Sequence, residues 1–122
     1  MCTAFITLLL TFASQAAADC GNLCDYYWWK TATTANVQAE LSGGADVMAR
    51  NLAPRLLVDY GSTPLHWAAT FGNSSKIQAL LAAGADAKAK DKNGETPWDL
   101  AQKNKIRNKT EGYWALNDAQ YN

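Results

Sequence analysis

Apolar positions with helical spacing fall into short stretches of the chain, each bounded by residues that start or stop helices. Thr63 and Pro64 open one stretch, because a hydroxyl followed by a proline at the first helical position is a typical helix start. A second stretch begins near Ser74 and ends at Gly84, a residue suited to the left-handed conformation that terminates helices. Residues 85–93 are too short for a helix and rich in turn formers. The pattern therefore predicts two helices followed by an extended finger.

The pattern repeats along the chain. Thr-Pro occurs at 63–64 and again 33 residues later at 96–97, which indicates a stacked repeat. Gly-Ala-Asp occurs at 44–46 and at 84–86, a separation of 40 residues, so the first finger is about seven residues longer than a regular one. We assign the excess to residues 52–58.

These repeats predict an all-α fold of about three helix-turn-helix units with short hairpin fingers. The expected units are about 24–60, 61–93 and 94–118, within one domain at 19–122. Aromatic clusters at both ends, Tyr26 to Trp29 and Tyr113-Trp114, are expected to plug the outer faces of the terminal units.

The central unit resembles the ankyrin repeat signature. The residues that carry this resemblance are Thr63, Pro64, Leu65, His66, Ala68, Ala69, Gly72, Ile77, Leu80, Leu81, Gly84, Ala85 and Asp86. The next unit departs from the signature where Trp98 and Asp99 replace Leu-His. The whole arrangement also looks like small exported ankyrin repeat proteins of bacteria.

The resemblance implies a solenoid that binds a protein partner through its finger tips and first helices. The positions that match the family's variable contact sites are Tyr60, Ser62, Thr70, Phe71, Lys92, Asn93, Glu95, Lys103 and Asn104. Trp67, if partly exposed, would add an aromatic anchor. Leu56 and Leu57, in the lengthened finger, either fold back on the helices or offer an apolar grip to the partner.

His66 is the only histidine of the chain. Its position in Thr-Pro-Leu-His implies, by resemblance, a hydrogen-bonded clasp between adjacent units, tied to the Thr63 hydroxyl and nearby backbone. A catalytic role would need an oriented partner that the sequence does not show. We therefore predict no catalytic residue.

The N-terminus is typical of an exported protein. Residues 4–13 are almost wholly apolar but too short to span a membrane, and small residues follow up to Ala18. Residues 1–18 are therefore expected to be a signal peptide, which leaves the mature domain periplasmic or secreted, without a stable membrane span.

Cleavage would leave Cys20 and Cys24, which are expected either to form a disulfide in an oxidising compartment or to remain two free buried thiols. Two cysteines and one histidine are too few for a usual zinc site, so we expect no metal and no cofactor.

The formal net charge of zero argues against a nucleic-acid binder. The lysines at 88, 90 and 92, with the basic run that starts at Lys103, would either attract an acidic partner or form a solvated face. Our leading interpretation is a monomeric, non-enzymatic, exported module that binds an unidentified protein. The alternative is a redox-linked or stress-protective accessory protein that uses Cys20 and Cys24.

Overall fold

The computed structural model describes residues 21–50, 61–71, 73–103 and 110–122, and every regular element in these residues is a helix. The elements are η1 (Gly21–Cys24, a 3-10 helix), α2 (Tyr26–Thr31), α3 (Thr34–Ser42), α4 (Pro64–Phe71), α5 (Ser74–Ala82), α6 (Pro97–Lys103) and α7 (Glu111–Tyr121). The prediction of an all-α fold is confirmed for this part of the chain. Element η1 was not predicted, and α7 continues three residues beyond the predicted end of the last unit at about residue 118.

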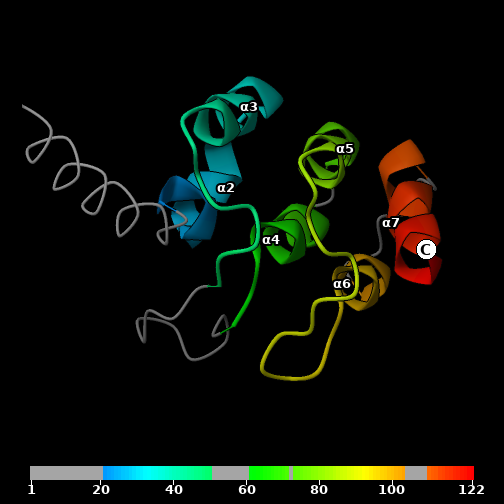
Figure 1. Ribbon diagram of the computed structural model, residues 1–122. Helices are drawn as coiled ribbons and strands as arrows, with labels where there is room; N and C mark the ends of the chain where they lie inside the picture. Colours follow the sequence, from blue (N-terminus) through cyan, green and yellow to red (C-terminus); the bar gives the residue numbers. More distant parts are fainter. Residues whose placement is uncertain (1–20, 51–60, 72, 104–109) are drawn as a thin grey trace, which may run out of the picture.

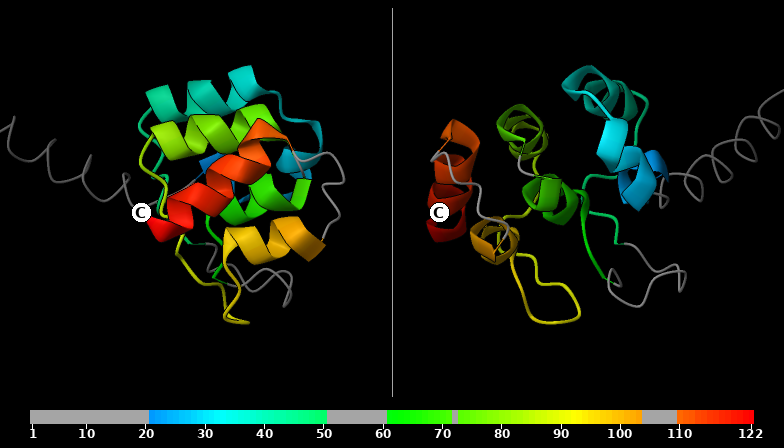
Figure 2. Two further views of the ribbon diagram at one scale, coloured as in Figure 1. Left: turned by 90° about the vertical axis from the view of Figure 1, so that its right-hand side faces the viewer. Right: turned by 180° about the vertical axis from the view of Figure 1, so that it is seen from behind.

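The helices form pairs that stack side by side (Figure 1). The first helices of the pairs, α2, α4 and α6, contact one another in chain order, and the second helices, α3, α5 and α7, do the same. The result is two layers of helices, seen from two further sides in Figure 2. The segment between α5 and α6 projects away from both layers as a finger.

Side chains cap the helices where the sequence pattern places their starts. The Oδ1 atom of Asn73 accepts a hydrogen bond from the backbone N–H of Lys76 at 3.0 Å and begins α5. Thr33 begins α3 in a reciprocal capping box with Asn36. At the end of α5, Gly84 has a φ of 93°, which a residue with a Cβ rarely adopts, and this explains why glycine follows the helix.

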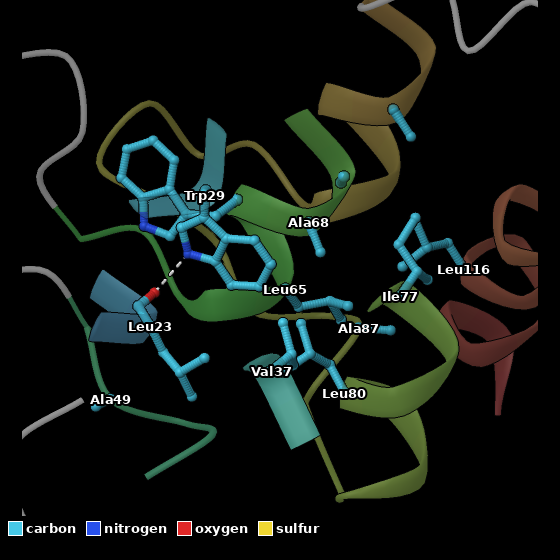
Figure 3. Packing of buried hydrophobic residues seen from close by; sticks show 13 residues of the cluster. Leu23, Trp29, Val37, Ala49, Leu65, Ala68, Ile77, Leu80, Ala87 and Leu116 are labelled. Carbon is cyan, nitrogen blue, oxygen red and sulfur yellow. Dashed lines mark hydrogen bonds between the residues drawn. The ribbon is translucent and has the colours of Figure 1, made fainter. Parts of the chain in front are cut away.

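The core lies between the two layers (Figure 3). Leu65, Ile77, Leu80 and Leu116 are completely buried there, and they come from two successive helix pairs. At the first pair, the Trp29 indole N–H donates a hydrogen bond to the Leu23 carbonyl oxygen at 2.8 Å, which satisfies the one polar atom of this buried ring. A core shared in this way cannot form within one pair alone.

His66 joins the second helix pair to the finger of the third, as the resemblance implied. The backbone N–H and the hydroxyl of Thr63 lie 3.1 and 2.8 Å from Nδ1, and the Glu95 carbonyl oxygen lies 2.9 Å from Nε2. Because the Thr63 N–H donates to Nδ1, the proton of the neutral ring must sit on Nε2 and point at Glu95. The ring is 1 % exposed, and this burial lowers the pKa of His66 from its ordinary value of 6.5.

Asp99 occupies the position of His66 in the last pair. Its Oδ2 atom accepts hydrogen bonds from the N–H of Thr96 at 2.9 Å and from the Thr96 hydroxyl at 3.0 Å. These bonds, above all the one from the backbone, lower the pKa of Asp99 from 3.8. An ionised carboxylate has no proton to donate, so Asp99 reproduces the local half of the histidine arrangement and not the half that reaches the next unit.

The backbones of α7 and α5 approach each other closely at Gly112 of α7. Its N–H donates to the Ser74 Oγ at 2.7 Å, and a Cβ added at Gly112 would lie 2.6 Å from the Ser74 Cα and 2.8 Å from the Ser74 carbonyl oxygen. No side-chain rotation removes a clash with backbone atoms. The close packing of α5 on α7 therefore requires glycine at this position.

Gly112→Ala is expected to lower the free energy of unfolding by about 1–3 kcal/mol, because α7 must move away from α5. Urea denaturation followed by circular dichroism measures the loss. Ser75→Ala, at an exposed position on α5, is the control and should change the stability by less than about 0.5 kcal/mol. Equal stability of Gly112→Ala and the wild type would show that the two helices are not packed this closely.

His66 makes the stability depend on pH near neutrality. Its folded-state pKa lies below the unfolded value of 6.5, so the unfolded chain binds the proton more readily. The stability that the neutral ring contributes is complete above pH 6.5 and decreases as the pH falls towards the folded-state pKa. We expect His66→Gln to be about 1–3 kcal/mol less stable than the wild type at pH 7.

The same variant tests the origin of the pH dependence, since the chain has no second histidine and Asp99 titrates below this range. Urea denaturation at pH 5 and pH 7 should give a clear difference for the wild type and a much smaller one for His66→Gln. An unchanged pH dependence in the variant would assign it to another group.

Candidate protein-binding surface

The finger before α6 is held by its own aspartates. Asp91 Oδ1 accepts hydrogen bonds from the N–H groups of Asn93 and Glu95, at 2.8 and 3.0 Å. The backbone closes the same turn, because the Asp91 N–H donates to the Glu95 carbonyl oxygen at 3.0 Å. Lys92 and Asn93 are exposed at the tip of this turn. The fold therefore fixes the backbone of the tip and leaves these two side chains free to meet a partner.

The base of the finger is attached to its neighbours. The Glu95 carbonyl oxygen is bonded to His66, as described above. On the other side, Arg50 Nη1 donates to the carbonyl oxygens of Lys90 at 2.5 Å and Gly61 at 3.0 Å. Arg50 thus connects the segment after α3, the start of the central pair and the finger.

An ion pair continues this surface onto α6. The ammonium group of Lys103 bonds to Glu95 Oε1, and this hydrogen bond raises the pKa of Lys103. Lys103 is exposed and Glu95 half-buried. The structure therefore brings together four of the predicted contact residues, Lys92, Asn93, Glu95 and Lys103, around one finger and the helix that follows it.

Two further predicted contact residues lie at the other end of α4. The Thr70 hydroxyl donates to the His66 carbonyl oxygen at 2.9 Å, and the Phe71 ring lies 5.7 Å from the Tyr26 ring. Both side chains are half-buried.

Two residues predicted for the contact surface are buried. Trp67 is 3 % exposed and Ser62 is 6 % exposed, so the expectation of a partly exposed Trp67 is corrected. The physical reason is that Trp67 faces the preceding helix pair, where its ring packs at 5.7 Å against the ring of Tyr26. Tyr60, Leu56, Leu57, Asn104 and Cys20 lie outside the described residues.

Sequence reasoning missed Arg50 and Met48, which connect successive segments without forming part of the motif. The Met48 Sδ atom accepts a hydrogen bond from the Asp86 N–H at 3.2 Å, next to the Arg50 bridge. Both residues follow the first Gly-Ala-Asp. A comparison of the two Gly-Ala-Asp segments could have drawn attention to them, because long side chains there reach the next finger.

The described part of the chain has no group of three or more histidine, cysteine, aspartate or glutamate side chains placed to hold a metal ion. Within the same residues, no helix has both the length and the apolar character needed to cross a membrane.

Comparison with known proteins identifies the repeat. Residues 47–101 match the family model described as ankyrin repeats in many copies. The ARF GTPase-activating protein Git of Drosophila melanogaster is 58% identical over 43 residues, which are 35% of this chain and 6% of that protein. The ankyrin repeat-containing protein P1E11.10 of Schizosaccharomyces pombe is 33% identical over 79 residues, 61% of this chain and 38% of that protein.

A third relative, the palmitoyltransferase ZDHHC13 of Homo sapiens, is 46% identical over 44 residues, 36% of this chain and 7% of that protein. This chain therefore spans well under half the length of each of these relatives. The family match at residues 47–101 includes α4, α5, the finger and the first part of α6, together with residues outside the described part. Residues 47–101 are thus similar to ankyrin repeats, which are typically non-enzymatic modules for protein–protein interaction.

Proposed function

We propose that this protein is an exported, non-enzymatic binding module that holds one protein partner against its finger and first helices. The observation that carries the proposal is the finger tip at Lys92 and Asn93, which is exposed on a backbone fixed by Asp91, His66 and Arg50. A surface that is already ordered loses little conformational entropy on binding, so its contacts contribute more fully to affinity.

The exposed side chains of the finger favour a polar contact with a partner, in which charged groups of the finger take part. Lys88, Lys90 and Lys92 are all exposed. Among the acidic residues, Asp86 and Asp91 accept hydrogen bonds from the finger's own backbone, and Glu95 is paired with Lys103. The lysine ammonium groups are thus the charges that this finger offers to a partner. This arrangement favours a partner with acidic side chains over the alternative of a merely solvated lysine face.

Residues outside the described part belong to the proposal as sequence predictions. Tyr60 and Asn104 would extend the surface on either side of the finger, and Leu56 and Leu57 would add an apolar grip. Trp67 and Ser62 are left out, because they are buried.

Replacement of the finger tip is expected to weaken capture of the partner. With the domain 19–122 as bait in an extract of the exported fraction, Lys92→Ala with Asn93→Ala should recover about fivefold less partner than the wild type, since truncated interface residues of this kind cost about 1 kcal/mol or more. Gln38→Ala, at an exposed position on α3, is the control and should recover the wild-type amount. A partner recovered equally with all three baits would contradict the proposed surface.

We also propose that residues 1–18 are removed on export and that Cys20 and Cys24 then form a structural disulfide. The apolar stretch 4–13 and the small residues before Asp19 support the cleavage. Cys24 is half-buried and packs against the core cluster beside Leu23, so a local bond would fix the start of the first helix pair.

N-terminal sequencing of the exported protein should therefore begin at Asp19. Thiol titration of the same sample under denaturing, non-reducing conditions should find no free thiol, and mild reductant should not open the bond in the folded protein. A pair that opens readily and reforms would favour the redox-linked alternative. A chain that starts at Met1 would contradict export by signal cleavage.

A further inference from the structure

The outward face of α7 differs from the rest of the surface. Glu111, Trp114, Asp118 and Tyr121 follow one another at spacings of three, four and three residues, which places them on one side of the helix. All four are exposed, Trp114 by 45% and Tyr121 by 79%. We call these four residues the acid–aromatic stripe. The stripe lies at the edge of the stack, where α7 forms the last helix (Figure 2).

The other second helices have no such face. The exposed residues of α5 are Ser75, Gln78 and Ala82. Those of α3 are Ala35, Asn36, Gln38, Ala39 and Ser42. A solvent face made of small or neutral polar residues is therefore sufficient for this fold. The packing of the fold therefore does not explain why α7 exposes two aromatic rings and two carboxylates.

One ring of the stripe is held in place by neighbouring aromatics. Trp114 lies edge-on to Tyr113 with ring centres 5.3 Å apart, and Tyr113 packs on Trp98 of α6 at 4.3 Å. The exposed part of the indole is thus presented by a supported side chain, which limits the entropy that it loses when a ligand binds.

The carboxylates of the stripe have only weak neutral contacts in the described structure. Glu111 Oε2 accepts from the Gln78 side-chain amide at 3.4 Å, and Asp118 Oδ1 accepts from that of Asn117 at 3.5 Å. Helix α7 has no lysine or arginine, and the one ion pair found among the described residues joins Lys103 to Glu95. Two negative charges thus stand next to two exposed rings without a described cation.

A carboxylate beside an aromatic face is suited to a lysine or, better, an arginine side chain, which can pair with the first and stack on the second. The chain uses related chemistry at its other end, where Lys30 Nζ lies 4.6 Å from the centre of the Tyr26 ring. In the stripe the pair occurs twice, seven residues apart, which corresponds to about 10.5 Å along a helix.

We propose that the acid–aromatic stripe of α7 is a second binding surface, which docks a basic helical segment of a partner with two arginine or lysine side chains seven residues apart. Its negative charge disfavours nucleic acid and anionic membrane surfaces. The surface is separate from the finger and the first helices, so the inference goes beyond the proposed function and does not depend on it.

Two capped, alanine-based helical peptides of identical composition test the spacing. One has two arginines seven residues apart, on one side of its helix, and the other has them five residues apart, on different sides. Titration followed by nuclear magnetic resonance should show two- to fivefold tighter binding of the first peptide, about the effect of one additional exposed cation–aromatic contact. The shifted resonances should include the Trp114 indole N–H.

Three variants locate the interaction. Glu111→Gln with Asp118→Asn, and separately Tyr121→Ser, should reduce the affinity for the first peptide two- to fivefold and remove its advantage. Tyr27→Ser, a matched change of an aromatic residue that is 67% exposed, should leave both unchanged. Lys92→Ala with Asn93→Ala should also leave them unchanged, which separates this test from that of the proposed function.

Equal affinities of the two peptides for the wild type would overturn the proposal, because general attraction to an acidic protein would then explain binding. The same conclusion follows if the stripe variants bind like the wild type. Sedimentation that shows self-association, lost in the stripe variants, would overturn it too and assign the stripe to a second copy of this chain.

Discussion

The arrangement of the finger relative to the helices depends on the buried imidazole of His66. One nitrogen accepts from Thr63 at the start of its own helix, and the other donates to the Glu95 backbone at the base of the next unit. The bond that the Thr63 N–H donates to Nδ1 requires the neutral ring, and burial keeps the ring neutral by lowering the pKa of His66. A single side chain therefore sets both the start of α4 and the position of the following finger.

Adjacent helix pairs are joined by apolar packing on one side of the stack and by hydrogen bonds on the other. Away from the fingers, adjacent pairs are joined by apolar side chains such as Ile77 and Leu116, and by the close contact that Gly112 permits. Towards the fingers, backbone carbonyl groups are joined by His66 and Arg50. The finger has little apolar surface to bury. These hydrogen bonds therefore fix the backbone that presents Lys92 and Asn93.

The sequence predicted the parts of this structure that are governed by local rules. Proline after Thr63, glycine at 84 and the recurrence of both motifs were enough to locate α4, α5 and the finger, because caps and turns depend on neighbouring residues. The burial of Trp67, the Arg50 bridge and the approach at Gly112 depend on which residues from another pair lie opposite. The spacing of motifs along the sequence does not show which residues of another helix pair lie opposite. The acid–aromatic stripe likewise became evident only once the buried side of α7 was known.

The tautomer of His66 in the folded protein tests the account most directly, because the clasp exists only with the proton on Nε2. Nitrogen-15 chemical shifts of the imidazole ring at pH 7 report this tautomer without any mutation. The account predicts one nitrogen of the protonated type at Nε2, with a proton that exchanges slowly with water, and one of the unprotonated type at Nδ1. A proton on Nδ1, or averaged shifts with fast exchange, would contradict the claim that His66 connects the two units.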